Sequence, residues 1–122
     1  MSIDVALEDL PAVIGERGPD AYLVSVRGTR PHVVAVIVAA RDGLLVVGAG
    51  RRTAMNVEDR PLVTLLWPVT QEHPKHSLLV DGTGRISEDG QWLEITPTSA
   101  ILHRAGGRRR AVPEDAAGSG EA

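Results

Sequence analysis

Residues 44–67, which read LLVVGAGRRTAMNVEDRPLVTLLW, hold the pattern that decides the fold of this chain. An apolar strand runs into Gly-Ala-Gly, two arginines and a threonine follow, and Pro61 precedes a second apolar strand. The segment from Thr53 to Arg60 is predicted to form a helix of about two turns. Thr53 is a candidate N-cap and Pro61 closes the helix. This order places an arginine pair at the mouth of a helix between two strands.

Hairpins join most of the strands predicted on either side of this unit. The Asp-Gly pair within residues 41–43 and the SEDG segment at residues 87–90 are turn signals that link antiparallel strands. Six strands are predicted, over residues 21–26, 31–40, 44–50, 62–67, 75–86 and 91–103. Antiparallel strands with several short connections indicate an all-β fold with minor α content, arranged as a sandwich or a barrel.

A helix is predicted ahead of the strands, over residues 3–16, because four apolar residues from Ile3 to Ile14 recur at helical spacing. Pro11 lies inside this segment and is predicted to divide it into two short helical pieces. Among the strands, residues 31–40 are almost entirely apolar, so both faces of that strand are expected to be buried. In a chain this short, such a strand indicates a second subunit.

The composition limits the class of protein. At 122 residues the chain has room for one domain, predicted over residues 1–104, and the Gly-, Ala- and charge-rich segment 105–122 is predicted to be a disordered tail. There is no Cys, which removes disulfides, thiolate catalysis and cysteine metal sites. A net charge of −3 argues against nucleic-acid binding. The longest apolar run is far shorter than the roughly 20 residues of a membrane helix, so we expect a cytoplasmic protein without membrane association.

Arg51, Arg52 and Thr53 form the most informative polar cluster. An Arg guanidinium offers paired donors to phosphate oxygens, and Thr adds a hydroxyl. The free backbone N–H groups of a helix start favour an anion at the same place. Gly48 and Gly50 would let a bulky ligand approach the backbone closely. The alternative is a solvated arginine pair at a strand end, and these residues alone do not separate the two readings.

The other polar residues carry less weight. His32 stands beside Pro31 and near Arg30 at the start of an apolar strand, where a lone histidine is more often structural than ligand-binding. The remaining histidines lack ligand spacing, so no metal site is predicted. No serine lies in a nucleophile elbow, and no pair of carboxylates is placed for acid–base catalysis. Any chemistry is therefore expected to depend on a bound cofactor.

The order of the segments resembles the pyridoxamine 5′-phosphate oxidase-like family of flavin-binding split β-barrels, to which the deazaflavin-dependent reductases are related. The resemblance covers roughly residues 20–104 and rests on AYLVSVRGTRPHVVAV, LLVVGAG, TAMNVEDRPLVTLLW and HSLLVDGTGRI in this order. It implies a Greek-key-like split barrel of about six antiparallel strands, with the short helix between the third and fourth strands. It also implies a homodimer with cofactor sites in the clefts between the subunits.

The same resemblance implies which residues hold the cofactor. The phosphate would meet basic and hydroxyl groups near the start of the short helix, and the ring would lie along residues 32–36 and 47–49. The implied cofactor-binding residues are Arg30, His32, Val33, Val34, Val47, Gly48, Ala49, Arg51, Arg52, Thr53, Trp67, His76 and Ser77. His76 and Ser77 would be contributed by the partner subunit. Thr53 departs from the family pattern, which commonly has Lys at this place.

Three functions remain open at this point. The first is an FMN-dependent oxidoreductase of unknown substrate. The second is a reductase that uses a deazaflavin coenzyme, whose anionic tail would meet Arg51, Arg52 and either Arg27 or Arg30. The third is a non-catalytic ligand-binding dimer, which the missing Lys and the few candidate catalytic residues favour. Residues 76–79 replace the Arg/Gln-rich strand of the true oxidases, which argues against vitamin B6 oxidation.

Overall fold

A computed structural model describes residues 2–105 and 112–113 of the chain. The elements in chain order are β1 (Ser2–Asp4), the 3₁₀ turn η1 (Leu7–Asp9), α1 (Leu10–Arg17), β2 (Asp20–Arg27), β3 (Arg30–Ile37), β4 (Ala39–Arg41), β5 (Leu44–Gly48), α2 (Arg51–Asp59), β6 (Leu62–Trp67), β7 (His76–Ile86) and β8 (Trp92–Arg104). The tail predicted from residue 105 lies almost wholly outside the described residues.

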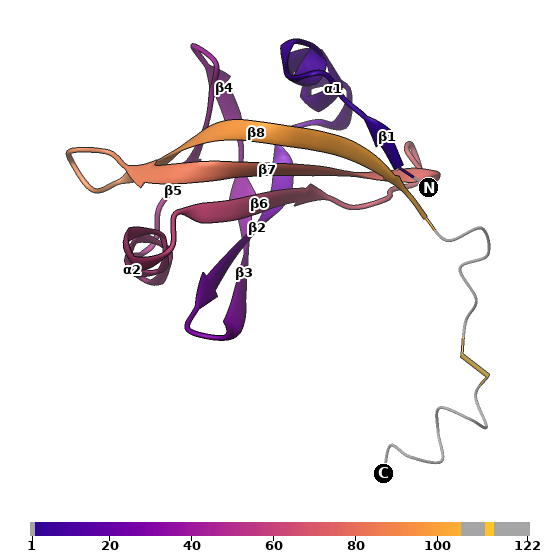
Figure 1. The fold of residues 1–122 in the computed structure, drawn as a ribbon. Coiled ribbons are helices and arrows are strands. Elements are labelled where there is room, and N and C mark those ends of the chain that lie inside the picture. Colours follow the sequence, from indigo (N-terminus) through magenta and orange to yellow (C-terminus); the bar gives the residue numbers. More distant parts are fainter. Residues whose placement is uncertain (1, 106–111, 114–122) are drawn as a thin grey trace.

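One antiparallel sheet of eight strands makes up most of the described chain. Its strands are hydrogen-bonded in the order β3-β2-β6-β7-β8-β5-β4, and β1 pairs with β8 outside this path. The sheet curls into an open barrel, and the β2–β3 hairpin projects from the long strands β6, β7 and β8 (Figure 1). Helix α2 lies beside this hairpin, whereas α1 lies at the other side of the long strands (Figure 1). The predicted all-β class with minor α content is confirmed.

The inner face of the curled sheet carries the hydrophobic core. In β2, Ala21, Leu23 and Ser25 are buried, whereas the residues between them are half-buried or exposed. This alternation is typical of a strand that covers a core with one face. The fully buried residues of the other strands are Val47, Leu65, Trp67, Leu78, Val80, Leu93 and Ile95. Helix α2 packs on the same face through Val57, which is 3% exposed.

Two glycines of β7 let neighbouring elements approach closely. A Cβ at Gly84 would lie 2.7 Å from Leu93 Cδ1 and 3.3 Å from Val57 Cγ1, so this glycine makes room for α2. A Cβ at Gly82 would lie 2.5 Å from the backbone oxygen of Thr96, next to the register shift in the β7–β8 pairing. The position of α2 on the sheet therefore depends on Gly84, and the close approach of β8 to β7 depends on Gly82.

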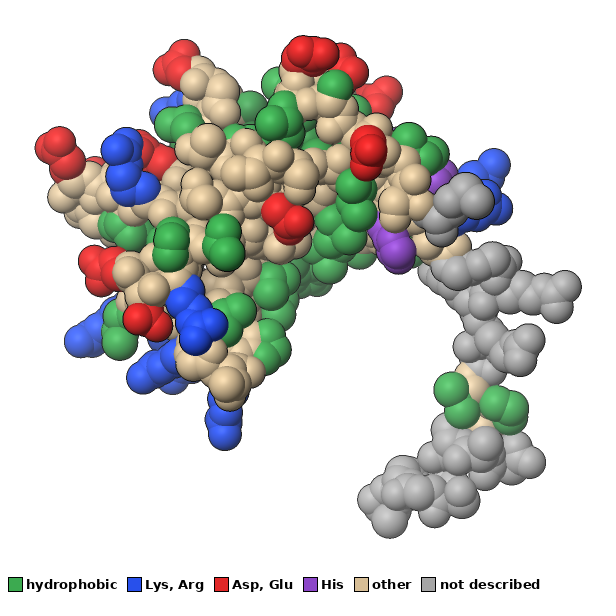
Figure 2. Space-filling model, in the orientation of Figure 1, with side chains coloured by type: hydrophobic (Ala, Val, Ile, Leu, Met, Phe, Trp, Pro, Cys, Tyr) green, Lys and Arg blue, Asp and Glu red, His purple; other side chains and the backbone are tan. Residues whose placement is uncertain are grey.

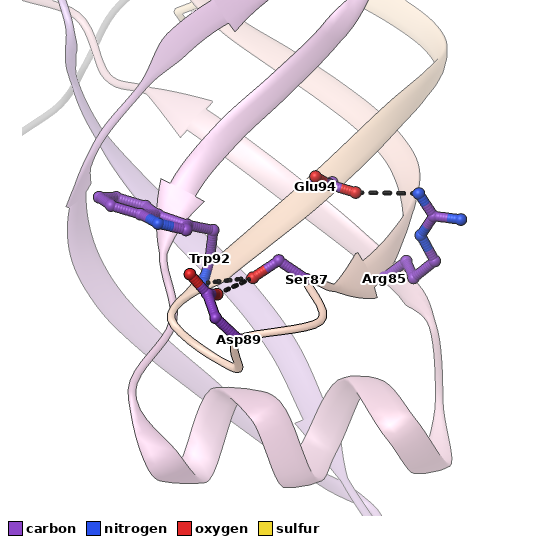
Figure 3. A network of polar contacts seen from close by, with 5 residues as sticks. All are labelled: Arg85, Ser87, Asp89, Trp92 and Glu94. Carbon is purple, nitrogen blue, oxygen red and sulfur yellow. Dashed lines mark hydrogen bonds and ion pairs between the residues drawn. The ribbon is translucent and has the colours of Figure 1, made fainter.

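A polar network closes the turn between β7 and β8 (Figure 3). Ser87 Oγ donates to Asp89 Oδ1 at 2.6 Å, and the backbone N–H of Gln91 donates to the same oxygen at 3.0 Å. The hydrogen bond from Ser87, followed by that from Gln91, lowers the pKa of Asp89. The backbone N–H of Trp92 donates to Ser87 Oγ at 3.1 Å. The hairpin predicted at residues 87–90 is confirmed.

The N-terminal segment differs from its predicted form. Residues 2–4 are strand β1, with Ser2 opposite His103 of β8, instead of the start of a helix. The chain does form two helical pieces, because η1 precedes α1 and Pro11 lies in the first turn of α1. A missing backbone N–H costs nothing at that place. Residues 2–4 therefore pair with the edge of β8, although their apolar spacing predicts a helix.

The predicted strand over residues 31–40 is divided into two. Strand β3 ends at Ile37, and Val38 turns into the core and donates its backbone N–H to Pro19 O at 2.8 Å. Strand β4 begins directly afterwards at Ala39. This break, together with β1, gives eight strands in the described chain where six were predicted.

The prediction that both faces of β3 are buried is wrong for the single chain. Val33 is 57% exposed and Ile37 is 70% exposed. They share the outer face of the β2–β3 hairpin with Tyr22, which is 44% exposed. We call these three residues the outer apolar face. Figure 2 shows hydrophobic side chains gathered along the hollowed underside of the molecule beside this hairpin.

Candidate functional site

Helix α2 begins two residues earlier than predicted. Its first residue is Arg51, and its N-cap is Gly50, which has an extended backbone and offers no capping side chain. Thr53 is therefore not the N-cap, and its side chain is 3% exposed on the face of α2 that packs on the sheet. Arg51 and Arg52 are both exposed. The first backbone N–H groups of the helix have no partners within the helix, which makes its start favourable for an anion.

A shallow pocket of about 720 Å³ lies between α2 and the tip of the β2–β3 hairpin. We call it the basic pocket, and its lining residues are Arg27, Gly28, Thr29, Arg30, Pro31, His32, Arg52 and Asn56. These described residues include three arginines and no carboxylate. Figure 2 shows Lys and Arg side chains gathered at the same corner of the molecule, over α2 and the hairpin tip. The pocket is therefore a local region of positive charge on a chain whose net charge is −3.

The sequence RGTR forms one wall of the basic pocket. Arg27 and Arg30 are cross-strand partners, with Gly28 and Thr29 as the two turn residues between them. Gly28 has a φ of +61°, which glycine adopts without the strain of a Cβ. Because side chains alternate along a strand, Arg27 lies on the same face of β2 as Ser25, the face against which α2 packs. The tight turn thus brings two guanidinium groups together beside the helix.

Asn56 holds α2 against this hairpin. Its Nδ2 donates to Ser25 Oγ at 3.1 Å, and the two residues are 3% and 1% exposed. Ser25 is the cross-strand partner of His32, and Arg52 lies one helical turn before Asn56. This buried hydrogen bond therefore sets how Arg52 is placed relative to His32 and the hairpin arginines.

His32 carries an unpaired polar atom in this pocket. Its Nδ1 is shielded from solvent and has no hydrogen-bond partner among the described residues. Buried polar atoms are nearly always paired, and leaving one unpaired costs roughly 1–3 kcal/mol. A polar group of a bound ligand would supply the missing partner. Together with three arginine forks, which suit phosphate oxygens, this atom makes the pocket fit a phosphate-bearing ligand.

The structure brings Arg30, His32 and Arg52 together in the basic pocket, and the other predicted cofactor residues lie outside its lining. Val33 and Val34 are exposed on β3, and Arg51 is exposed on α2. Gly48 is the last residue of β5, and Ala49 follows it in the link to α2. Val47, Thr53 and Trp67 are buried, whereas His76 and Ser77 are half-buried at the start of β7. Trp67 is 2% exposed and its Nε1 donates to Gly18 O at 2.9 Å, which gives its side chain a packing role.

Sequence reasoning left Thr29 and Asn56 out of the site, and it included Arg27 only in the deazaflavin alternative. The signal for Arg27 was present, because two arginines flank a glycine turn in RGTR. Asn56 gave no signal of this kind. Its contribution depends on Ser25, which lies 31 residues away in the sequence.

A second cleft, of about 670 Å³, lies over the outer side of β5 and β8. Its lining includes Ile37, Val46, Gly48 and Trp92, and the last two are cross-strand partners. Trp92 is 48% exposed and points away from the β7–β8 turn (Figure 3). This cleft brings Gly48 beside an aromatic ring, away from the basic pocket.

Neither a metal cluster nor a membrane helix is found in the described part of the chain. No three His, Asp or Glu side chains in residues 2–105 and 112–113 are grouped so that they could hold a metal ion. The helices in the same residues are too short and too polar to cross a membrane.

Sequence comparison places the chain beside two mycobacterial proteins, although no protein-family model matches it. An uncharacterized protein of Mycobacterium bovis is 36% identical over 102 residues, which covers 70% of this chain and 71% of the relative. An uncharacterized protein of Mycobacterium tuberculosis matches with the same figures. The chain belongs to the family of these two proteins.

Solved structures share the fold of this family member at lower identity. A Listeria innocua protein provisionally named pyridoxamine 5′-phosphate oxidase has a TM-score of 0.65 at 20% identity, over 80% of this chain and 98% of that one. An F420 reductase has a TM-score of 0.58 at 18% identity, over 69% of this chain and 90% of that one. The expected split β-barrel of the pyridoxamine 5′-phosphate oxidase-like proteins is confirmed.

The same fold occurs in proteins with other named ligands. An FAD-binding protein of Mycobacterium smegmatis has a TM-score of 0.60 at 11% identity, over 84% of this chain and 98% of that one. The heme storage protein HutZ of Vibrio cholerae has a TM-score of 0.62 at 15% identity, over 82% of this chain and 96% of that one. At such identities the likeness establishes the fold and leaves the ligand to be argued from this chain's own residues.

Proposed function

We propose that this family member is a flavin-binding protein that takes FMN and acts as an oxidoreductase of unknown substrate. The observation that carries the proposal is the basic pocket, where Arg27, Arg30 and Arg52 meet the buried, unpaired Nδ1 of His32. This set of donors fits a phosphate monoester. The similarity in fold to an FAD-binding protein and to a provisionally named pyridoxamine 5′-phosphate oxidase supports a flavin as the phosphate's carrier.

In this proposal the chain supplies position and charge. Arg52 and the two hairpin arginines hold the phosphate, and the backbone N–H groups at the start of α2 add partial positive charge. His32 offers its unpaired Nδ1 as a hydrogen-bonding atom to the ligand. When bound, the flavin supplies the redox chemistry itself.

An apolar track for the ring continues from the basic pocket. Val34 and Val36 follow His32 on the same face of β3, because side chains alternate along a strand. Val34 is 36% exposed, so this track is open to a ligand. From His32 to Val36 the strand advances about 13 Å, which leaves room for a flat ring system beyond the phosphate.

A deazaflavin coenzyme is the second candidate. The similarity in fold to an F420 reductase favours it, as do three arginines, which is more cationic charge than one phosphate requires. Arg27 and Arg30 would then meet an extended anionic tail along the hairpin tip. FMN and the deazaflavin would compete for the same pocket, so displacement of one by the other decides between them.

Ligand binding without catalysis is the third candidate. Its support is the chemistry of the pocket, whose described lining offers His32 as its single acid–base group and contains no carboxylate or thiol. The similarity in fold to a protein named as a heme storage protein adds support. Cofactor binding without turnover of any electron donor is the result that this candidate predicts.

We also propose that the chain forms a homodimer with the cofactor sites near the subunit interface. The outer apolar face supports this, because Val33 and Ile37 are more than half exposed on a strand that is apolar on both sides. Covering such surface stabilises an assembly by about 25 cal/mol per Å² of apolar area. Because β3 carries this face and also reaches the basic pocket at His32, a partner on it would lie close to the bound cofactor.

The test of the proposed function is an absorbance spectrum of the protein after FMN addition and desalting. Flavin bands that survive desalting and differ from those of free FMN are expected. A colourless protein that also ignores the deazaflavin would refute both cofactor proposals and leave the ligand-binding dimer.

A further inference from the structure

A smaller pocket, of about 340 Å³, lies at the opposite end of the β2–β3 hairpin from the basic pocket. Arg17 at the end of α1, Ala21 of β2, Trp67 of β6 and Thr70 of the following loop contribute to its lining. We call it the Arg17 pocket. Between Ala21 and Arg27 the strand advances about 20 Å, so this pocket is separate from the proposed phosphate site.

The walls of the Arg17 pocket are held in place by hydrogen bonds. Trp67 Nε1 donates to Gly18 O at 2.9 Å, and His73 Nε2 donates to Glu16 O at 3.1 Å, so both rings are fixed against the end of α1. The backbone N–H of His73 donates to Thr70 Oγ1 at 3.0 Å, which closes the loop on itself. No hydrogen bond among the described residues uses the hydroxyl proton of Thr70, so this proton remains free to donate.

Arg17 is the group in these walls that lacks a partner. Its Nη1 is shielded from solvent and makes no hydrogen bond to any described residue. The ion pair found in the described chain joins Arg85 to Glu94, so Arg17 is not paired with Asp20, which also lines the pocket. Burial lowers the pKa of Arg17, and Glu16 opposes this effect. A guanidinium partly withdrawn from water is costly unless an anion compensates it.

We propose that the Arg17 pocket binds a small carboxylate with an apolar body. The fork of Arg17 donates to the carboxylate oxygens, Thr70 adds a hydroxyl donor, and the apolar body lies against half-buried Pro68 beside the edge of Trp67. The negative charge of Asp20 disfavours a dianion such as phosphate, so the two pockets select different anions. A volume of about 340 Å³, against about 720 Å³ for the basic pocket, limits the ligand to a small molecule.

The two tryptophans of the chain provide a direct readout of this site. Trp67 lines the Arg17 pocket and Trp92 lines the cleft over β5 and β8, so their indole N–H signals report on different places. We expect benzoate, titrated into the ¹⁵N-labelled full chain to about 10 mM, to shift the Trp67 signal saturably. The Trp92 signal should stay in place. Benzamide, which has the same ring without the charge, should bind at least about tenfold more weakly.

Substitutions then assign the binding to Arg17. Arg17→Gln should weaken benzoate binding about tenfold or more, and Arg17→Lys should keep part of it because the charge remains without the fork. Arg27→Gln is the matched control in the basic pocket and should titrate as the wild type does. Equal binding of benzamide, an Arg17→Lys variant that binds as the wild type does, or the absence of any Trp67 shift would overturn the proposal. The test needs no flavin, so the proposed function stands or fails separately.

Discussion

Asn56 of α2 and Ser25 of β2 are joined by a hydrogen bond of 3.1 Å between two side chains that are almost fully buried. It ties the helix that carries Arg52 to the strand that pairs with β3 at His32. Polar groups in such a place stabilise the fold only while both are paired. The same hydrogen bond therefore contributes to the stability of the core and also fixes the geometry of the basic pocket.

Asn56→Ala is expected to lower the free energy of unfolding by about 1–3 kcal/mol, because Ser25 Oγ loses its buried partner. Ser25→Ala should have a similar effect. The double variant should be more stable than the sum of the two losses predicts, by at least about 0.5 kcal/mol, as for residues in direct contact. Urea unfolding measures the free energy of unfolding of the three variants. Glu58→Ala, which changes an exposed residue of the same helix, is the control and should have little effect. Strictly additive losses would show that the two side chains do not act together.

Gly82→Ala is expected to destabilise the fold by about 1–3 kcal/mol, since its Cβ would meet the backbone oxygen of Thr96 at 2.5 Å. Gly15→Ala is the matched control. Nothing lies within 4 Å of a Cβ there, and the residue is inside α1. This second change should raise the midpoint of thermal unfolding, because alanine favours a helix over glycine by roughly 0.5–1 kcal/mol. Equal effects of the two substitutions would refute the close approach at Gly82.

Val33→Glu is expected to convert a dimer into a monomer, because it places a charge within the outer apolar face. In sedimentation equilibrium the wild type should have twice the chain mass of 13.0 kDa, and the variant should have the chain mass itself. Ala12→Glu changes an exposed residue of α1 and should leave the dimer intact. A monomeric wild type, or a variant that remains dimeric, would contradict the proposed interface.

Asp89 should titrate below the ordinary aspartate pKa of about 3.9, because hydrogen bonds from Ser87 and Gln91 favour its charged form. Its contribution to stability is then present above the ordinary value and is lost as the pH falls through the lower folded-state pKa. Carboxyl ¹³C shifts followed against pH measure this midpoint. Ser87→Ala removes the largest cause, so it should return the midpoint towards the ordinary value. A wild-type midpoint at or above about 3.9 would refute the network in Figure 3.

The strand pattern was largely readable from the sequence, because it rests on local signals. Apolar runs and Gly-containing turns predicted the hairpins, and Pro61 marked the end of α2. The errors came from long-range pairing. Strand β1 exists because the edge of β8 is free to accept it, and β3 ends because Val38 bonds Pro19. Neither partner is visible in the local spacing.

The candidate site was predictable only in part for the same reason. The arginines of α2 were found from their place at a helix start, yet Arg52 alone of that pair lines the basic pocket. The contact between Asn56 and Ser25 fixes how α2 is rotated about its axis, and this rotation turns Arg52 towards the pocket and Arg51 away from it. The two contact residues are far apart in the sequence and meet only when the chain folds. Thr53 looked like a cap and a ligand residue, but the earlier helix start at Arg51 turns it into the core.

The central claim is that the basic pocket holds the phosphate of a flavin, and the most direct test compares FMN with riboflavin, which lacks that phosphate. Fluorescence titration of the wild type should show FMN binding at least about tenfold more tightly than riboflavin. Arg52→Ala should remove most of this difference, whereas Arg51→Ala, the matched change one residue earlier, should preserve it. Equal affinity of the wild type for FMN and riboflavin, or an Arg52→Ala variant that still prefers FMN as strongly, would contradict the account.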